Sequence, residues 1–145
     1  MKLLSVAVPC YNSAAYMRRC VDSLLPGGEE VEILIIDDGS ADDTLSIARA
    51  YEQKHPGVVR AIHQENAGHG GAINTALRHA SGLYFKVVDS DDWVDAAALG
   101  KVLERLRHFA ANHVDIDVVI SNYVYDKVDA RRKKVMEYRR ALPRG

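Results

Sequence analysis

The chain has 145 residues, of which 48% are hydrophobic and 27% are charged, with ten Gly and four Pro. This is the length and composition of one globular domain, and it excludes a disordered, collagen-like or low-complexity chain. No apolar run approaches the roughly 20 residues that span a bilayer, so we expect a cytoplasmic protein. Cys10 and Cys20 are too few for a disulfide framework or a four-ligand zinc site, and we expect both to be reduced packing residues.

The net charge of −1 combines an acidic body with a basic tail. Residues 126–145 hold eight Lys or Arg against three Asp or Glu, which leaves 11 basic and 17 acidic residues in residues 1–125. An acidic body does not attract nucleic acid, so we expect no nucleic-acid partner. The tail is interpreted as a solvated connector or helix, and peripheral docking on an anionic membrane face is the alternative.

The first unit of the chain has the pattern of a strand followed by a helix. The apolar run 3–8 is typical of a strand that is buried on both faces of a parallel sheet, and Pro9 is expected to end it. Asn12 or Ser13 is the expected cap of the following helix, which the Pro-Gly-Gly segment 26–28 ends.

The second unit repeats this pattern. Residues 31–36 form a second apolar run, and the Asp-Asp-Gly-Ser segment 37–40 is expected to form a turn. Asp42 or Asp43 can then cap a helix that continues through Tyr51.

The rest of the chain continues the alternation. In chain order we expect a strand at 58–63, a glycine-rich turn at 66–71, a helix at 72–80, a strand at 83–88, an acidic turn at 89–92, a helix at 95–109 and a last strand at 118–124. This order predicts a three-layer α/β/α fold with an open, mainly parallel sheet. Ligands of such sheets bind beyond the carboxyl ends of the strands.

The acidic turn is a candidate metal site. Asp89 and Asp91 are separated by one residue and follow a buried strand, so their carboxylates can converge on a hard cation such as Mg²⁺ or Mn²⁺. A cation between them would let these acids share a pocket with a diphosphate. The alternative is that the turn only caps the next helix.

A candidate site for the base of a nucleotide lies in the segments that follow the first two predicted strands. The carboxylate of Asp38 can accept a hydrogen bond from the imide N–H of uracil or thymine, or from guanine, whereas cytosine presents an acceptor. Tyr11 can stack on that base. The alternative for Asp38 is a plain turn with a capping acid. The alternative for Tyr11 is a half-buried aromatic residue at the start of a helix.

The glycine-rich turn is a candidate site for a phosphate or a sugar. Gly68, Gly70 and Gly71 lie between a predicted strand and a predicted helix, where backbone N–H groups meet anions. Ile73 stands where the dinucleotide fingerprint needs a third glycine, so that motif is absent. His69 either donates to a phosphate oxygen or is a surface histidine without a role.

Four segments in this order, residues 5–12, 35–44, 66–74 and 88–92, resemble the family 2 glycosyltransferases of the GT-A fold. The resemblance covers about residues 3–125. It implies a nucleotide-diphospho-sugar donor, most simply a UDP-sugar, a divalent Mg²⁺ or Mn²⁺ ion, and an inverting transfer to an acceptor hydroxyl. It further implies that residues 1–125 are the N-terminal, nucleotide-sugar-binding half of such a domain, and that residues 126–145 connect it to a missing acceptor-binding region.

The roles of individual residues carry over by position. Pro9 and Tyr11 match the segment that packs on the base, and Asp38 matches the acid that reads the uracil imide. Asp89 and Asp91 match the Asp-x-Asp pair at the ribose and the metal. Asp91 is the first choice as metal ligand, and the adjacent Asp92 is the alternative.

Two departures from the family pattern limit what the resemblance implies. Many members carry an Arg where this chain has Ile73, so backbone groups of residues 68–71 are expected to substitute at the diphosphate. The family's catalytic carboxylate base has no match before Gly145, and we interpret Asp115 and Asp117 as turn residues. We therefore expect the chain to be a fragment of a longer enzyme.

The function that the resemblance implies is sugar transfer to a saccharide or lipid-linked acceptor in cell-envelope or capsular polysaccharide synthesis, with the basic tail at the inner face of the membrane. A non-catalytic nucleotide-binding module and a Mg²⁺-dependent phosphotransferase are the alternatives.

Overall fold

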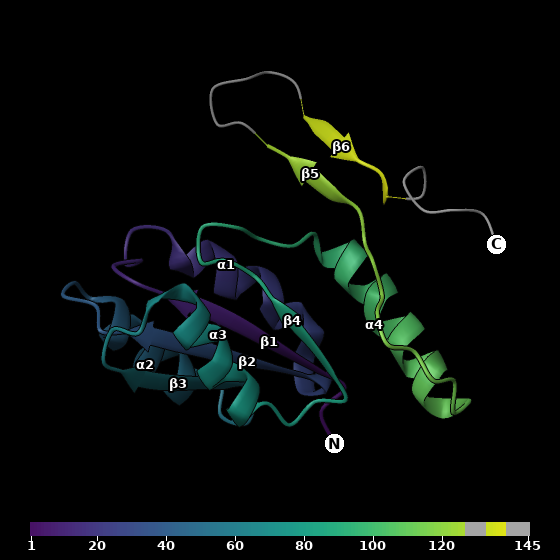
Figure 1. Cartoon of the computed structure of the whole chain (residues 1–145), viewed down its shortest axis with the longest axis horizontal. Helices are drawn as coiled ribbons and strands as arrows, with labels where there is room; N and C mark the ends of the chain where they lie inside the picture. The colour runs from purple at the N-terminus through teal and green to yellow at the C-terminus, as the bar shows by residue number, and fades with distance from the viewer. Residues whose placement is uncertain (127–132, 139–145) are drawn as a thin grey trace. The chain divides into compact units, whose positions relative to one another are not determined.

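The computed structural model describes residues 1–126 and 133–138, and the chain divides into a compact unit of Met1–Asn112 and a second unit of His113–Gly145 (Figure 1). The first unit is built on a four-stranded sheet with the order β3-β2-β1-β4. Its strands are β1 (Leu4–Cys10), β2 (Val31–Asp38), β3 (Val59–Gln64) and β4 (Tyr84–Val87). Every neighbouring pair is parallel, so all four strands end at the same edge, which we call the carboxyl edge.

Helices cover both faces of this sheet. They are α1 (Met17–Leu24), the 3-10 helix η1 (Leu25–Glu30), α2 (Thr44–Lys54), α3 (Gly68–His79) and α4 (Ala96–Ala111). Buried side chains of α1, α2 and α4 share one core cluster with Val6, Val8 and Ile33 of the sheet. Ala72 and Ala76 of α3 share a second cluster with other sheet residues. The predicted three-layer α/β/α fold with a parallel sheet is confirmed.

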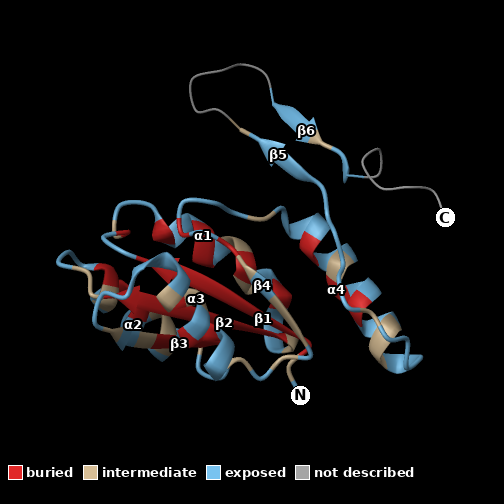
Figure 2. Ribbon diagram, in the orientation of Figure 1, coloured by how far each residue is buried: buried red, intermediate tan, exposed pale blue. Residues whose placement is uncertain are grey.

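The two central strands are buried along their whole length (Figure 2). They show the continuous apolar pattern of strands that are covered on both faces. In β2, Ile33 and Ile35 face the α1, α2 and α4 side, whereas Leu34 and Ile36 face α3, because successive side chains of a strand point to opposite faces. The outer strand β3 has exposed positions among its buried ones.

Pro9 does not end β1, contrary to the expectation from the sequence. The strand continues to Cys10, and Pro9 is paired with Ile36 of β2. Pairing between β1 and β4 stops at Ala7, whose carbonyl accepts from the Val88 N–H. The missing N–H of Pro9 therefore leaves no hydrogen bond of the sheet unmade.

The predicted last strand at 118–124 is wrong. Residues 114–122 form neither helix nor strand, and β5 (Tyr123–Tyr125) pairs antiparallel with β6 (Lys134–Met136) in a separate two-stranded sheet. Val118 and Ile120 are 73% and 51% exposed. A short apolar run satisfies the strand pattern, but the pattern does not determine which strand it pairs with.

The basic tail is described only in part. Its residues 127–132 and 139–145, which include Arg131 and Arg132, lie outside the described residues. Lys133 forms an ion pair with Asp126 at 3.2 Å. Among the helices of residues 1–126 and 133–138, none is both long enough and apolar enough to span a membrane.

Candidate functional site

The predicted site residues come together at the carboxyl edge of the sheet. Tyr11 follows β1, Asp38 ends β2, the glycine-rich segment 66–71 follows β3, and the acidic turn 89–92 follows β4. Strand β1 lies between β2 and β4, so Asp38 and the acidic turn flank the end of β1 on its two sides. This is the edge at which ligands of parallel sheets bind.

Asp37 and Asp38 are the last two residues of β2. The sequence had suggested that they belong to a turn, and this expectation is wrong. Because they are consecutive strand residues, Asp37 faces the α1 and α2 side and Asp38 faces α3. Both are buried, with exposed fractions of 0% and 3%. The turn follows at Gly39, which has φ of 73°, and a Cβ there would lie 2.9 Å from the Asn66 backbone nitrogen. Only glycine fits between the turn and the glycine-rich segment at this point.

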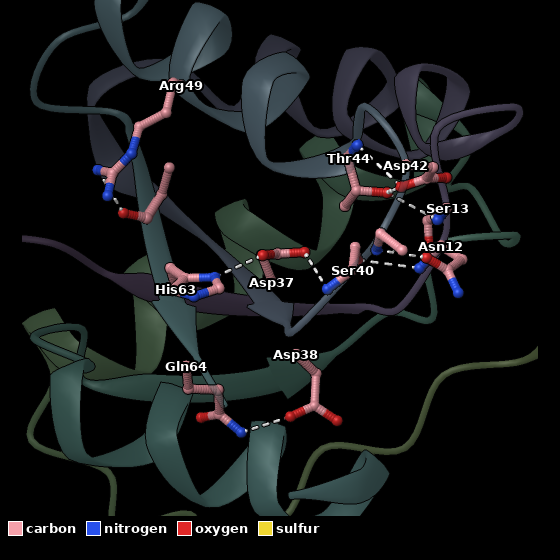
Figure 3. Close-up of polar contacts among 12 residues, drawn as sticks. Asn12, Ser13, Asp37, Asp38, Ser40, Asp42, Thr44, Arg49, His63 and Gln64 are labelled. Carbon is pink, nitrogen blue, oxygen red and sulfur yellow. Dashed lines mark hydrogen bonds and ion pairs between the residues drawn. The ribbon is translucent and has the colours of Figure 1, made fainter. Parts of the chain in front are cut away.

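Each of the two acids is held by the residue opposite to it on β3 (Figure 3). Asp37 Oδ2 lies 2.7 Å from His63 Nδ1, and Asp37 Oδ1 accepts from the Ser40 N–H at 3.3 Å. Asp38 Oδ1 accepts from Gln64 Nε2 at 2.7 Å and from the Ala67 N–H at 2.8 Å. His63 and Gln64 carry no local signal of this role in the sequence, because only the register between β2 and β3 places them opposite the acids.

The loop after β1 is joined to the loop after β2. Asn12 has φ of 49°, its N–H donates to Ser40 Oγ at 2.9 Å, and its Oδ1 accepts from the Ala41 N–H at 2.8 Å. The backbone N–H of Ala14 donates to Asp42 Oδ2 at 3.1 Å. These contacts fix the position of the loop in which Tyr11 lies with 55% of its surface exposed. An exposed ring on a fixed loop is available to stack on a ligand.

The helix after β1 begins later than the sequence suggested. Neither Asn12 nor Ser13 is its N-cap, because α1 begins at Met17. The carbonyl of Ser13 instead accepts from the N–H groups of Tyr16 and Met17 in a preceding turn. In the next loop Asp43 occupies the N-cap position of α2 but makes no capping hydrogen bond with its side chain, whereas Asp42 Oδ1 accepts from the Thr44 N–H at 3.0 Å.

In the acidic turn, Ser90 points inward and the acids point outward. The Asp92 N–H donates to the Asp89 carbonyl at 2.9 Å and closes the turn. Ser90 is 7% exposed and its hydroxyl lies 2.9 Å from that of Ser13, whereas Asp89, Asp91 and Asp92 are exposed. Outward carboxylates beside an inward hydroxyl are suited to meeting a ligand from solvent.

The three acids are close enough to repel one another. The pKa of Asp92 is raised, first by its partial burial and then by the charges of Asp91 and Asp89, whereas Lys86 lowers it. Exposed carboxylate oxygens are the donors that Mg²⁺ and Mn²⁺ prefer, and a cation would relieve this repulsion. The donor set thus fits a hard divalent ion, although the described part of the chain holds no group of three or more His, Cys, Asp or Glu arranged around one point.

The glycine-rich segment provides the start of α3. The helix begins at Gly68, where φ is 76°, and not near Ala72, so Gly70 and Gly71 lie in its first turn. The first N–H groups of a helix have no partner within it, and those of α3 lie at the carboxyl edge. His69 Nε2 lies 3.6 Å from Asp89 Oδ1, which brings this segment next to the acidic turn.

Trp93 directly follows the acidic turn, and Cys10 is the last residue of β1. Trp93 is 37% exposed and lies under Arg19, whose Cζ is 3.2 Å from the ring centroid. Cys10 and Cys20 are free and buried, and burial raises the pKa of each thiol to about 12. Their role as reduced packing residues agrees with this burial.

Comparison with known proteins shows which family shares this arrangement. The sequence profile described as "Glycosyl transferase family 2" matches residues 5–143. Chondroitin synthase of Escherichia coli is 42% identical over 106 residues, which are 72% of this chain and 15% of that protein. Glycosyltransferase GlyG of Streptococcus pneumoniae serotype 4 is 37% identical over 131 residues, which are 88% of this chain and 42% of that protein. The chain therefore spans less than half the length of these relatives.

Solved structures show the same fold. TarS 1–349 of S. aureus in complex with UDP-GlcNAc matches with a TM-score of 0.67 and 32% identity, over 76% of this chain and 32% of that chain. The mannosyltransferase PcManGT from Pyrobaculum calidifontis, in complex with GDP-Man and Mn²⁺, matches with a TM-score of 0.61 and 28% identity, over 69% of this chain and 31% of that chain. The profile match over residues 5–143, together with these relatives, leads to one conclusion: the chain belongs to glycosyl transferase family 2, a family of transferases, and its sheet is of the GT-A type.

Proposed function

We propose that this chain is the donor-binding part of an inverting glycosyltransferase that uses a UDP-sugar together with Mg²⁺ or Mn²⁺. The observation that carries the proposal is the position of Asp38 and of the acidic turn 89–92 on the two sides of the β1 end in a family 2 chain. Support comes from the solved structure of TarS with UDP-GlcNAc, which shares this fold at 32% identity.

The base is proposed to lie between Tyr11 and Asp38. The exposed Tyr11 ring would stack on it, and the carboxylate of Asp38 would accept its imide N–H. Pro9 is buried in β1 next to this position and would form part of the floor under the base. Cytosine presents an acceptor at the corresponding ring nitrogen, so a carboxylate favours uracil.

The diphosphate is proposed to lie between the acidic turn and the start of α3. Asp91 and Asp89 would hold the divalent ion, with Asp92 as the alternative ligand, and the N–H groups of Gly68, Gly70 and Gly71 would face the phosphates. When bound, the ion supplies positive charge against the charge that develops on the leaving diphosphate. Support for a metal comes from the Mn²⁺ in the structure of PcManGT.

The acceptor is proposed to be a saccharide or a lipid-linked saccharide of cell-envelope or capsular polysaccharide synthesis. Support comes from the similarity to chondroitin synthase, a polysaccharide synthase by name. Contact of the basic tail with the inner face of the membrane remains part of this proposal, and most of that tail lies outside the described residues. No acid of residues 1–126 or 133–138 is assigned as the catalytic base.

Calorimetric titration of the chain with UDP, with and without Mn²⁺, tests the proposal. We expect binding that requires Mn²⁺ and that is lost in Asp91→Ala. Asp115→Ala is the matched control, because Asp115 is an exposed acid that belongs to none of the four segments of the candidate site, and it should bind UDP like the parent. Absence of metal-dependent binding by the parent, or unchanged binding by Asp91→Ala, would contradict the proposal.

A further inference from the structure

The carboxylate of Asp38 is held in one orientation by two donors that meet the same oxygen. Gln64 Nε2 and the Ala67 N–H both donate to Asp38 Oδ1, at 2.7 Å and 2.8 Å. Figure 3 shows this oxygen turned toward Gln64 and the other oxygen, Oδ2, pointing away from it. The residue is 3% exposed, so its carboxylate has few directions in which to meet a ligand.

The two donors also fix the polarity of this contact. A backbone N–H only donates, and the Gln64 amide presents its NH₂ group because an ionised carboxylate only accepts. Oδ1 is therefore engaged on the protein side, and no hydrogen bond within residues 1–126 or 133–138 reaches Oδ2. Asp38 thus offers one acceptor, Oδ2, in a defined direction.

We propose that Gln64 is a specificity-determining residue of the donor site, and that it selects the base by holding Asp38 so that only Oδ2 faces the ligand. This inference rests on the proposed function, in which Asp38 accepts the imide N–H of uracil. Uracil and cytosine have the same shape, but the ring nitrogen N3 is a donor in uracil and an acceptor in cytosine. A single aimed acceptor therefore favours UDP over CDP, whereas the ribose, diphosphate and metal contacts are the same for both.

The inference predicts a reversal of base preference in Asp38→Asn. In this variant the side-chain amide has one acceptor and one donor end. Because Gln64 and the Ala67 N–H both donate to the Oδ1 position, the amide oxygen must take that position. The NH₂ group then takes the position of Oδ2 and faces N3 of the base, where it suits cytosine and opposes uracil.

Competition titrations of UDP and CDP with Mn²⁺ measure this preference in the parent and three variants. The parent is expected to prefer UDP by about tenfold or more, since one hydrogen bond to a charged group separates the two ligands. Asp38→Asn is expected to prefer CDP. Gln64→Met is expected to weaken UDP binding by about tenfold and CDP binding by less than about twofold. The double variant keeps only the Ala67 N–H as a donor to the Oδ1 position, so the amide is held less firmly and the preference for CDP should be reduced.

The matched control is Gln53→Met, which makes the same change at an exposed position of α2 and should bind both ligands like the parent. If Gln64 only stabilises the fold, Gln64→Met should weaken the binding of UDP and of CDP equally. This result would overturn the inference. If Gln64→Met fails to fold, an unreversed preference in Asp38→Asn overturns it. Failure of the parent to bind either nucleotide with Mn²⁺ would instead contradict the proposed function on which the inference rests.

Discussion

The hydroxyl groups of Ser13 and Ser90 lie 2.9 Å apart in a buried hydrogen bond that joins the loop after β1 to the acidic turn after β4. The N–H of Ser13 also donates to Thr44 Oγ1 at 2.8 Å, at the start of α2. Ser13 therefore connects three loops of the carboxyl edge. Since Ser90 lies between Asp89 and Asp91, the bond to Ser13 determines that the middle residue of the turn points inward and that the two acids point outward.

Ser90→Ala should loosen the acidic turn without changing its charge. The lost hydrogen bond should lower the free energy of unfolding by about 1 kcal/mol, measured by chemical denaturation. Mn²⁺-dependent UDP binding should weaken severalfold, because Asp89 and Asp91 are then held less firmly. Ser46→Ala is the control, since Ser46 is exposed and its hydroxyl only donates to the nearby Asp43 carbonyl. Equal UDP binding by Ser90→Ala and the parent would show that the bond does not position the acids.

Tyr11→Ala should weaken UDP binding by about tenfold or more, since stacking of an aromatic side chain on a base contributes about 1–3 kcal/mol. Tyr11→Phe keeps the ring and should bind UDP nearly like the parent, so the pair separates stacking from hydrogen bonding by the hydroxyl. Tyr16→Ala is the control, because Tyr16 is 45% exposed and lies five residues further along the same segment. Calorimetry with saturating Mn²⁺ measures all four proteins, and loss of binding in Tyr11→Phe would contradict the stacking role.

Much of the fold could be predicted from local patterns. The apolar runs around Val6, Ile35 and Val87 predicted three parallel strands, because strands of a covered parallel sheet are apolar at nearly every position. The order of strands and turns then predicted which loops share the carboxyl edge. The start of α3 was predicted four residues too late, because glycine is a poor helix former and residues 68–71 include three glycines.

The arrangement of side chains within the site depends on contacts between distant segments. Asp38 was predicted as a site residue, but its partner Gln64 is 26 residues away and is found only from the register of β2 and β3. The bond from Ser13 to Ser90 spans 77 residues and has no local signal in the sequence. The wrong strand at 118–124 has the same cause, because an apolar run does not specify its partner.

Gly82 lies so close to β1 that a side chain cannot be added without moving the backbone. A Cβ at Gly82 would lie 2.6 Å from the Ser5 nitrogen and 2.9 Å from the Leu4 carbonyl carbon. Gly82→Ala should therefore lower the free energy of unfolding by about 1–3 kcal/mol, because the pairing of β1 with β4 must shift. Gly100→Ala is the matched control, since nothing lies within 4 Å of a Cβ at that position of α4. Gly100→Ala should raise the free energy of unfolding by about 0.5–1 kcal/mol. A similar effect of both substitutions would contradict the close approach of Gly82 to β1.

Glu32 is a buried acid outside the site, and it should make the fold sensitive to acid. It is 3% exposed, and its Oε1 accepts from Ser5 Oγ at 2.5 Å, from Ser81 Oγ at 3.0 Å and from the Ser81 N–H. Burial raises the pKa of Glu32, but the hydrogen bonds from Ser5, Ser81 and Gly82 together outweigh burial and hold the pKa below its ordinary value of 4.5.

The sign of the pH dependence follows from this lowered pKa. The folded state holds the proton of Glu32 less tightly than the unfolded state, so its contribution to stability is complete above about pH 4.5 and is lost as the pH falls through the lower pKa of the folded state. In Glu32→Gln the amide oxygen can accept the same bonds without a charge. The variant should lose about 1 kcal/mol at pH 7. Below about pH 4.5, its free energy of unfolding should fall less steeply than the parent's. Urea denaturation from pH 3 to pH 7 measures both slopes, with the exposed Glu29→Gln as control. An acid slope as steep in Glu32→Gln as in the parent would mean that other carboxylates cause the loss of stability.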